Sequence, residues 1–146
     1  MHIINTSNIE KAKQLIKTAQ ALIVVQAQDD NFDRKILEYG NFQILLSPES
    51  GQRKSTIRNI DSGLNSVLAK IAAKNNISIG INLNEISRLE KKQKAERLVK
   101  VKQNIRICRK AKTKLAVITN NKKEASHLLL SLGASTQQIK ESIFIG

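Results

Sequence analysis

Cysteine and histidine, the residues that form disulfides and most zinc sites, are nearly absent from this chain of 146 residues. Its single cysteine, Cys108, excludes an internal disulfide and a zinc cage built from cysteines. Its two histidines, His2 and His127, lie far apart in the sequence and leave no cluster of metal ligands. These absences exclude disulfide scaffolds and zinc hydrolases, and we expect the protein itself to bind no cofactor or metal.

Long apolar segments are absent too. The longest purely apolar run, Ala21–Val25, has five residues, whereas a membrane-spanning helix needs about 20. The amino terminus, Met1–Asn5, has no basic region followed by an apolar stretch, which is the pattern of an export signal. We therefore expect a soluble, cytoplasmic protein that has no membrane partner.

Aromatic residues make up only 3% of the chain, and tryptophan is missing. Those present are dispersed along the sequence as Phe32, Tyr39, Phe42 and Phe144. They are too far apart to form a platform on which unpaired bases could stack. An RNA ligand would therefore be held through its phosphates.

The chain does contain a large excess of positive charge. Lysine and arginine number 25 against 12 acidic residues, which gives a formal net charge of +13. The 40% of hydrophobic residues and the scattered charges are typical of a globular rather than a disordered chain. A length of 146 residues suits one domain with a hydrophobic core, so we expect a single domain over residues 1–146 that binds something acidic.

Short runs of β type alternate along the chain with amphipathic stretches. Strands are expected at His2–Asn5, Ala21–Gln26, Phe42–Ser47, Ile77–Leu83 and Leu115–Thr119. Helices are expected at Ile9–Thr18, Asp33–Tyr39, Leu64–Lys74, Arg88–Lys112 and Lys123–Leu132. The repeated βα order favours an α/β fold with a mostly parallel sheet or barrel.

The clearest helical pattern lies in residues 64–74, where apolar residues recur at the spacing of one buried face. These residues are Leu64, Val67, Leu68, Ile71 and Ala72. Gly40 and Gly133 follow two other expected helices, at positions where glycine is favoured because it takes a positive φ without a steric clash. Both glycines are therefore predicted to end helices.

Most of the positive charge lies in one segment, from Arg88 to Lys114. This segment has twelve lysines and arginines against two acids, Glu90 and Glu96, so it carries +10 of the net charge of +13. Its apolar residues follow helical spacing and form one stripe, Leu98, Val101, Ile105 and Cys108. We interpret it as a helix whose basic side contacts RNA or DNA, because like charges repel unless a polyanion lies close. A merely solvated helix face is the alternative, and a membrane surface is less favoured because the stripe has no tryptophan or phenylalanine.

A second basic cluster, Arg53, Lys54 and Arg58, lies in or just after a polar loop that begins at Pro48, the only proline. Loops at the carboxyl ends of parallel strands are where βα folds usually bind ligands. Gly51–Ser55 is superficially similar to a phosphate-binding P-loop, but it lacks the first glycine and the glycine before the lysine, which excludes nucleotide hydrolysis there. The alternative for this basic loop is an ordinary exposed segment.

Other candidate catalytic residues have simpler structural interpretations. Asp29, Asp30 and Asp33 could bind a divalent metal, but they lie around the start of an expected helix, where acids cap free N–H groups. Cys108 lies on an apolar stripe without a histidine near it in sequence and is expected to be a buried structural thiol. His127 is expected to be a partly buried helix residue. We therefore predict no catalytic site in this chain.

Two stretches of the sequence are distinctive, Gln43–Pro48 and Ile60–Leu83. Together with the loop between them they give a strand ending in Ser-Pro, a short basic loop, a helix carrying Val-Leu-Ala-Lys and a strand with a small residue before its last apolar positions. In this chain these features are Ser47-Pro48, Arg53-Lys54, Val67–Lys70 and Gly80–Leu83. The combination resembles archaeal ribonuclease P protein component 3, and the likeness extends over most of the chain.

The resemblance implies a TIM-like barrel related to the polymerase-and-histidinol-phosphatase domain, without that domain's metal-binding histidines. It also implies a subunit of the ribonuclease P endoribonuclease, a ribonucleoprotein that removes 5′ leaders from precursor tRNA. In that complex the RNA performs the reaction with magnesium, while component 3 works with component 2 and the other ribonuclease P proteins to support the RNA. RNA-binding residues are expected at basic positions that match the family or lie in the basic loop, namely Arg34, Arg53, Lys54, Arg58, Lys74, Lys122 and Lys123. Arg34, Lys74 and the basic loop are expected at one rim of the sheet.

The chain also departs from the family pattern. Family members are longer and begin with additional βα units, whereas the five or six strands expected here are too few for a closed barrel. We therefore expect a shortened TIM-barrel-like sheet that is open, completed by a partner or covered by Ile143–Ile145. Where the family often has aspartate before its helix and Arg-Pro after the next strand, this chain has Asn65 and Asn84-Glu85, so contacts made by that aspartate or arginine are not carried over.

Two other functional classes stay open from the residues alone. A general RNA-binding or ribosome-associated basic α/β protein would share the charge and the small core. A small-molecule enzyme would need acid and base groups at the carboxyl ends of the strands, where the residues are mainly Ser47, Asn82, Asn84 and Thr119. The general RNA-binding protein is therefore the stronger alternative.

Overall fold

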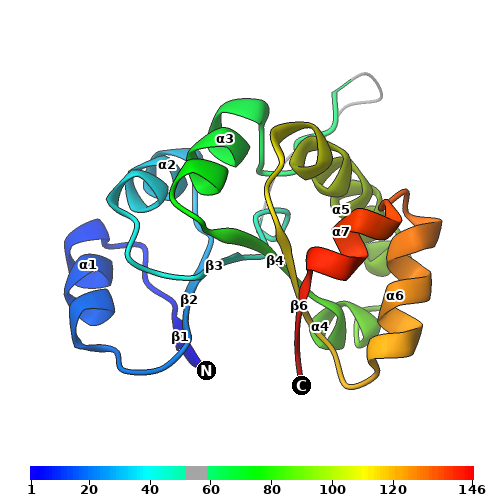
Figure 1. Ribbon diagram of the computed structural model, residues 1–146, viewed down its shortest axis with the longest axis horizontal. Coiled ribbons are helices and arrows are strands. Elements are labelled where there is room, and N and C mark those ends of the chain that lie inside the picture. The colour runs from blue at the N-terminus through cyan, green and yellow to red at the C-terminus, as the bar shows by residue number, and fades with distance from the viewer. Residues whose placement is uncertain (52–58) are drawn as a thin grey trace.

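The computed structural model describes residues 1–51 and 59–146, and within them six strands alternate with seven helices (Figure 1). The strands are β1 His2–Ile4, β2 Ile23–Gln26, β3 Ile44–Leu46, β4 Ser78–Asn82, β5 Leu115–Ile118 and β6 Ile143–Ile145. The helices are α1 Ile9–Thr18, α2 Asp30–Tyr39, α3 Ser66–Lys74, α4 Leu83–Ser87, α5 Lys91–Ala111, α6 Lys122–Ser131 and α7 Thr136–Glu141. Each predicted strand and helix has a counterpart among them, most with shifted boundaries.

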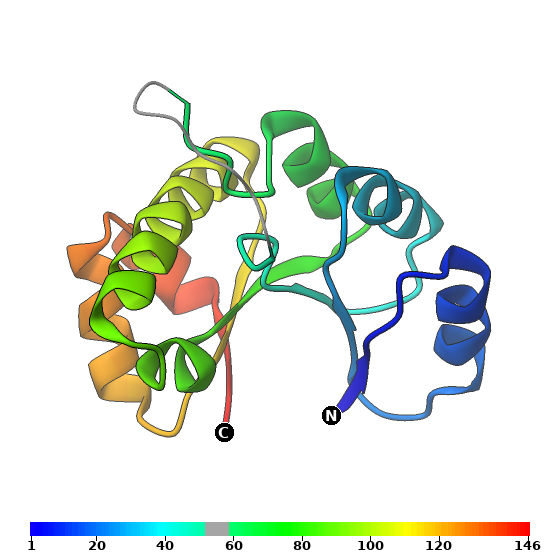
Figure 2. The ribbon, with the colours of Figure 1, turned by 180° about the vertical axis from the view of Figure 1, so that it is seen from behind.

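The strands form one sheet in the order of the chain, from β1 to β6, and all neighbouring strands are parallel. The sheet curls into a half-barrel with the helices along its convex side (Figures 1 and 2). Within the described residues, β1 and β6 are its two edges and do not pair with each other. The predicted shortened TIM-barrel-like fold is therefore confirmed, and the segment Ile143–Ile145 supplies the sixth strand.

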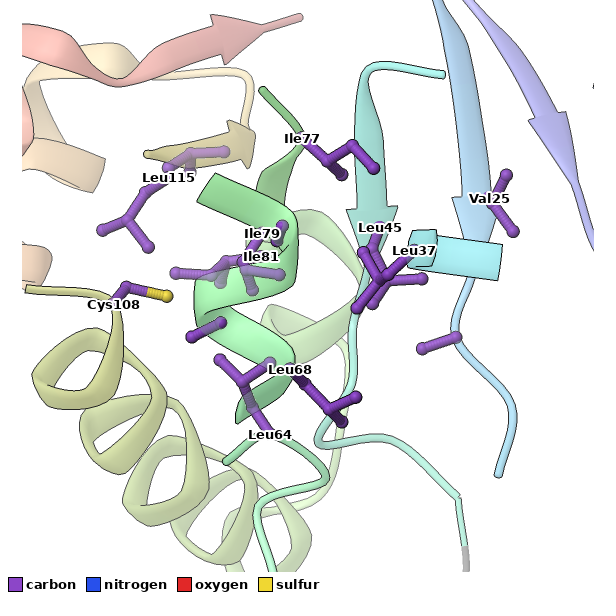
Figure 3. Packing of buried hydrophobic residues seen from close by; sticks show 14 of the residues in the cluster. Val25, Leu37, Leu45, Leu64, Leu68, Ile77, Ile79, Ile81, Cys108 and Leu115 are labelled. Carbon is purple, nitrogen blue, oxygen red and sulfur yellow. The ribbon is translucent and has the colours of Figure 1, made fainter. Parts of the chain in front are cut away.

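The main hydrophobic core lies between the sheet and the helices (Figure 3). Ile79 and Leu115 of neighbouring strands pack there with Leu68 of α3 and Cys108 of α5, and all are almost fully buried. All four residues of β5 are buried. Leu115 and Val117 face this core, whereas Ala116 and Ile118 belong to a second apolar cluster on the other face of the sheet.

A smaller apolar cluster lies on the concave side of the sheet, and its buried members are Val24, Ile44, Leu46, Ala116 and Ile118. Gly80 of β4 makes room for this cluster. A Cβ atom at Gly80 would lie 2.7 Å from Ile44 Cγ2 and 2.9 Å from Leu46 Cδ1, which is closer than real side chains approach. The central strand therefore needs glycine at this position for its neighbours to pack across it.

Helix α3 buries a slightly different face from the predicted one. Leu64, Leu68 and Ala72 are buried as predicted, but Val67 is 51% exposed, so its assignment to the core is wrong. The helix packs on both the sheet and α5, and this second contact buries Ala69 instead. The spacing of apolar residues within one helix does not indicate how a second neighbouring helix changes which face of it is buried.

The predicted helix Arg88–Lys112 corresponds to α5, and a short helix that was not predicted, α4, precedes it. The Asn82 side chain accepts a hydrogen bond from the Glu85 N–H at 3.1 Å and caps the short helix α4. The chain then turns before α5 begins at Lys91. The predicted apolar stripe of α5 is confirmed, because Val101, Ile105 and Cys108 are buried and Leu98 packs against the core.

The two glycines that were predicted to end helices have the expected backbone geometry. Gly40 directly follows α2 with a φ of 72°, and Gly133 lies just beyond α6 with a φ of 99°. Residues with a side chain rarely adopt such angles. Both helix ends therefore depend on glycine.

Candidate nucleic-acid interface

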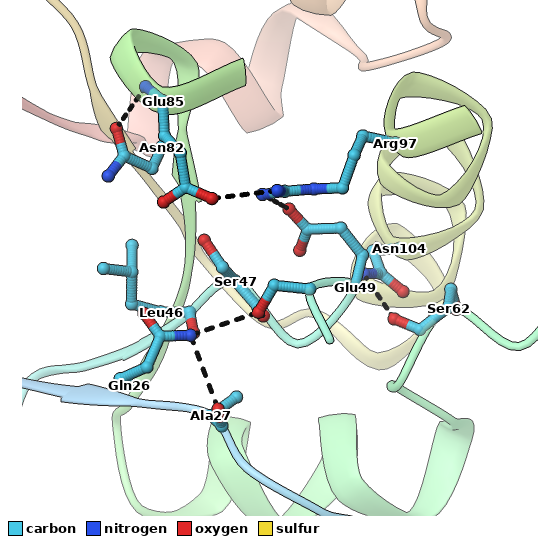
Figure 4. Close-up of polar contacts among 11 residues, drawn as sticks. Gln26, Ala27, Leu46, Ser47, Glu49, Ser62, Asn82, Glu85, Arg97 and Asn104 are labelled. Carbon is cyan, nitrogen blue, oxygen red and sulfur yellow. Dashed lines mark hydrogen bonds and ion pairs between the residues drawn. The ribbon is translucent and has the colours of Figure 1, made fainter. Parts of the chain in front are cut away.

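The carboxyl ends of the central strands carry a set of polar side chains (Figure 4). Gln26, the last residue of β2, donates from Nε2 to the backbone oxygen of Leu46 at 3.1 Å and to Ser50 Oγ at 3.2 Å. Ser50 Oγ in turn donates to the backbone oxygen of Ser47 at 2.7 Å. These hydrogen bonds fix the chain directly after β3, at the edge where parallel βα folds bind their ligands.

Arg97 of α5 links two carboxylates at the same edge (Figure 4). Its Nη2 lies 3.0 Å from Glu49 Oε1, and its Nη1 lies 2.9 Å from Glu85 Oε1. The Glu49 side chain is 1% exposed, and this burial raises the pKa of its carboxyl group against the opposing effect of Arg97. Arg97 thus joins the loop after β3 and helix α4 to α5. The expectation that the basic residues of this helix all lie on its outer surface is therefore wrong for Arg97.

One of the aspartates near the start of α2 is its helix cap. Asp29 accepts a hydrogen bond from the Phe32 N–H at 2.7 Å, which confirms the capping interpretation for this residue. Asp33 lies within α2 and accepts a hydrogen bond from the Gln28 N–H at 2.8 Å, so it holds the chain just before the helix. Across residues 1–51 and 59–146, no group of three or more histidine, cysteine or acidic side chains is close enough to hold a metal ion.

Two residues that were considered for catalysis lie in different environments. Burial raises the pKa of the Cys108 thiol to about 12, which confirms that it is a structural thiol. His127 is exposed, so the prediction of a partly buried histidine is wrong. Helix α6 packs through Ala125 and Leu129. His127 is midway between these two positions and therefore points to the opposite side of the helix.

None of the helices that the structure describes has the length and apolar content needed to cross a bilayer.

The described residues that were predicted to bind RNA lie at both rims of the sheet, some where the strands end and one where the strands begin. Arg34 is near the start of α2, and Lys122 and Lys123 begin α6, so all three lie toward the carboxyl ends of the strands. Lys74 is the last residue of α3, which returns toward the amino ends of the strands. The expectation that Lys74 shares a rim with Arg34 is therefore wrong. The basic loop residues Arg53, Lys54 and Arg58 lie outside the described residues.

Arg34 and Lys122 each contact another side chain. Arg34 donates from Nε to Glu38 Oε1 at 3.0 Å, an i,i+4 pair on the surface of α2. The Lys122 ammonium lies 5.1 Å from the centre of the Phe144 ring in β6. The positive charges of the two lysines at the start of α6 lie beside the positive end of the helix dipole and are repelled by it. A bound anion would relieve this repulsion.

A cavity of about 990 Å³ lies between α2 and α3 beside Arg34. Its described lining includes Asp29, Asp30 and Asp61, which give this cavity an acidic character. A phosphate backbone is repelled by such a lining. The cavity beside Arg34 is therefore a poor match for RNA, and the role of Arg34 stays a prediction.

A second cavity, about 530 Å³, lies along the outer side of α5. Its polar lining includes Lys102, Arg106 and Arg109, and among the described residues that line it there is no acid. These three cations are spaced i, i+4 and i+7 and so lie on one face of α5. They were predicted only as part of the general positive charge of the helix, although their spacing in the sequence indicates a shared face.

Comparison of the sequence with characterised proteins gives one consistent result. Over 113 residues, 77% of the chain, it is 25% identical to ribonuclease P protein component 3 of Methanococcus vannielii and 22% identical to that of Methanococcus maripaludis strain C7. The chain resembles ribonuclease P protein component 3. It spans about half the length of these two component 3 proteins, since the matched residues cover 46% of each. No protein-family profile matches the chain.

Comparison with solved structures identifies a similar fold. The structure matches one chain in a cryo-EM structure of archaeal ribonuclease P with mature tRNA, with a TM-score of 0.77 and 19% sequence identity. The match covers 95% of this chain and 62% of that chain. The curled parallel sheet with its outer helices is therefore a known architecture. The sequence similarity to the two Methanococcus proteins confirms the resemblance to component 3 noted in the sequence.

Proposed function

We propose that this chain is a protein subunit of ribonuclease P, of the component 3 type, which supports the catalytic RNA in the removal of 5′ leaders from precursor tRNA. The similarity to component 3 over 77% of the chain carries this proposal. The net charge of +13 supports it, because an RNA partner neutralises such a charge.

The contribution of the chain to this reaction is electrostatic. A folded RNA brings phosphates close together, and protein cations replace part of the counterions that would otherwise screen them. The magnesium needed for cleavage is bound by the RNA. No residue of this chain is assigned to bond cleavage: Arg97 holds the Glu49 and Glu85 carboxylates, and the Cys108 thiol is buried.

The proposed partners are ribonuclease P RNA, precursor tRNA, component 2 and the other ribonuclease P proteins. Two features support contact with RNA, the basic positions at the start of α6 and the basic loop after β3. The proposed RNA-binding residues are Arg34, Arg53, Lys54, Arg58, Lys74, Lys122 and Lys123.

Reconstitution tests the proposal. Ribonuclease P RNA and component 2 are mixed with a precursor tRNA, with and without this chain, and the magnesium concentration that gives half-maximal leader cleavage is measured. We expect the chain to lower this concentration because its cations replace counterions. An unchanged magnesium requirement would overturn the proposal.

Two controls sharpen this experiment. The chain alone, freed of RNA, is expected to show no leader cleavage, and magnesium-dependent cleavage by it would contradict a purely supporting role. Arg53→Ala with Lys54→Ala is expected to raise the magnesium requirement more than Lys11→Ala with Lys17→Ala, which removes the same charge from exposed positions of α1. Equal effects of the two pairs would remove the basic loop from the RNA-binding surface.

A further inference from the structure

Helix α5 lies on the convex side of the half-barrel (Figure 2). Residues of α5 border a groove there. One wall of this groove is α5, with the side chains of Lys102, Arg106 and Arg109. The other side is formed by Leu132 and Gly133, just after α6. We call it the α5 groove.

Hydrogen bonds hold neighbouring segments of the chain against α5 at both ends of the α5 groove. Gln103 donates from Nε2 to the backbone oxygen of Ile60 at 2.9 Å and to Ser62 Oγ at 3.1 Å, so the segment that follows the basic loop is held against α5. Arg109 donates from Nη1 to the backbone oxygen of Gly133 at 3.2 Å. This bond uses only part of the guanidinium, whose other N–H groups can still bind a ligand.

The charge of the α5 groove is of one sign. Lys102, Arg106 and Arg109 form no ion pair with any residue of the described chain. The sequence from Val99 to Ala111 contains no acidic residue at all. Neighbouring cations on one helix face repel each other, and a bound polyanion removes this cost.

Apolar side chains lie beside these cations. Val99 is 49% exposed on the same helix face, and Leu132 is partly buried across from it. A nucleic-acid strand presents both chemistries, because its phosphates alternate with sugars that have apolar edges. An inorganic anion or a free phosphate would use the cations alone.

We propose that the α5 groove binds the phosphodiester backbone of an RNA strand. Lys102, Arg106 and Arg109 contact successive phosphates, and Val99 and Leu132 contact the sugars between them. Lys102 and Arg109 are seven residues apart, which is about 10 Å along the helix axis and long enough to contact more than one phosphate of a strand. The row of cations therefore matches a few consecutive phosphates. This inference rests on the proposed function and names a surface for it that is distinct from the two rims of the sheet.

Matched charge variants test the proposal. Lys102→Ala with Arg106→Ala removes two cations from the groove, and Lys11→Ala with Lys17→Ala removes two from α1, at the opposite end of the half-barrel (Figure 1). All four residues are exposed, so both variants are expected to melt at nearly the same temperature as the unmodified chain. Circular dichroism melting verifies this before binding is measured.

Binding is measured by fluorescence anisotropy with labelled ribonuclease P RNA and with an unrelated RNA of equal length, at several salt concentrations. We expect the groove pair to weaken binding about tenfold and to reduce the slope of log K against log salt by about 1.4–1.8, since each phosphate contact contributes about 0.7–0.9. The α1 pair should change both quantities much less. Equal effects of the two pairs on ribonuclease P RNA would overturn the groove as an RNA site.

The RNA-binding and reconstitution experiments together distinguish a failure of the α5 groove as an RNA site from a failure of the subunit role. If the groove pair weakens both RNAs equally and the chain has no effect on leader cleavage, the groove binds RNA but the subunit role is wrong. If the chain lowers the magnesium requirement and the groove pair binds RNA like the α1 pair, the subunit role stands and the groove is wrong. Displacement of the RNA from the groove by polyglutamate at a lower concentration than by unlabelled RNA would instead identify an acidic protein as the occupant and overturn the proposal.

Discussion

A single buried carboxylate, that of Glu49, ties the loop after β3 to helix α5. Its only ion-pair partner within the described chain is Arg97, at 3.0 Å, and the Arg97 side chain is itself only 14% exposed. Removing one partner of a buried ion pair leaves the other charge without compensation. The position of Glu49, shortly after β3, therefore depends on one arginine of a distant helix.

Arg97→Ala is expected to lower the free energy of unfolding by about 2–4 kcal/mol, because it leaves the Glu49 carboxylate buried without a cation. Urea denaturation at neutral pH measures this. Arg106→Ala is the control, since Arg106 is an exposed arginine of the same helix and its removal should cost less than about 0.5 kcal/mol. A loss below about 1 kcal/mol for Arg97→Ala would contradict the structural role of the pair.

The buried Glu49 carboxyl also predicts a dependence of stability on pH. Burial raises its pKa above the ordinary value of 4.5, so the folded protein binds this proton more tightly than the unfolded chain does. The resulting stability is fully present below pH 4.5 and is lost as the pH rises through the raised pKa. In Glu49→Gln this contribution is absent. The unmodified chain should therefore lose stability relative to Glu49→Gln between pH 4 and neutral pH in urea titrations, and a constant difference would contradict the raised pKa.

At the scale of elements, the packing of β3 against β4 depends on the glycine at the centre of β4, Gly80. Gly80→Ala would place a Cβ atom 2.7 Å from Ile44 Cγ2, so the neighbouring strand must shift. We expect a loss of about 1–3 kcal/mol in the free energy of unfolding, as for other overpacked cores. Gly80→Ala combined with Ile44→Ala should cost clearly less than the sum of the single changes, since the second change removes the clash. Additive costs would show that Gly80 is not a packing residue.

Local signals in the sequence predicted the elements well. Helix α1 has the predicted bounds, Ile9–Thr18, and the glycines after α2 and α6 end those helices as expected. Helix α4 was missed because the preceding strand was predicted to extend to Leu83 and no helix was expected before Arg88. An asparagine that caps α4, Asn82, was the available signal.

Long-range contacts were not predictable from these local patterns. The Arg97–Glu49 pair joins residues that are 48 positions apart, and nothing in the sequence near either residue indicates the other. Arg34 and Lys74 lie at different rims of the sheet because Arg34 is near the start of its helix and Lys74 is at the end of its helix. The α5 groove needed the position of Gly133 beside Arg109, which only the fold provides.

At the scale of the whole molecule, the sheet has two open edges. Within the described chain, β1 and β6 each pair with one neighbour only. Apolar side chains are exposed at both edges, with Ile3 46% and Ile143 39% accessible. A parallel edge strand with unpaired backbone groups is a template for pairing with another chain.

We expect these edges to make the chain associate with itself or depend on a partner. Sedimentation at several concentrations, in enough salt to remove bound RNA, should show association, and Ile3→Lys with Ile143→Lys should reduce it because charged edges resist pairing. Val67→Lys, at an exposed position of α3, serves as the control. A stable monomer whose β1 and β6 amides are protected from hydrogen exchange would contradict this expectation.

The identity of the RNA that the chain binds in its own cells tests the subunit role most directly. The tagged chain is captured after ultraviolet crosslinking, and the attached RNA is sequenced alongside a sample prepared with the Lys102→Ala and Arg106→Ala variant. We predict enrichment of ribonuclease P RNA and of precursor tRNA with uncleaved 5′ leaders, with a smaller yield from the variant. Ribosomal RNA in proportion to its abundance, without enrichment of ribonuclease P RNA, would contradict the subunit role and favour a general RNA-binding protein.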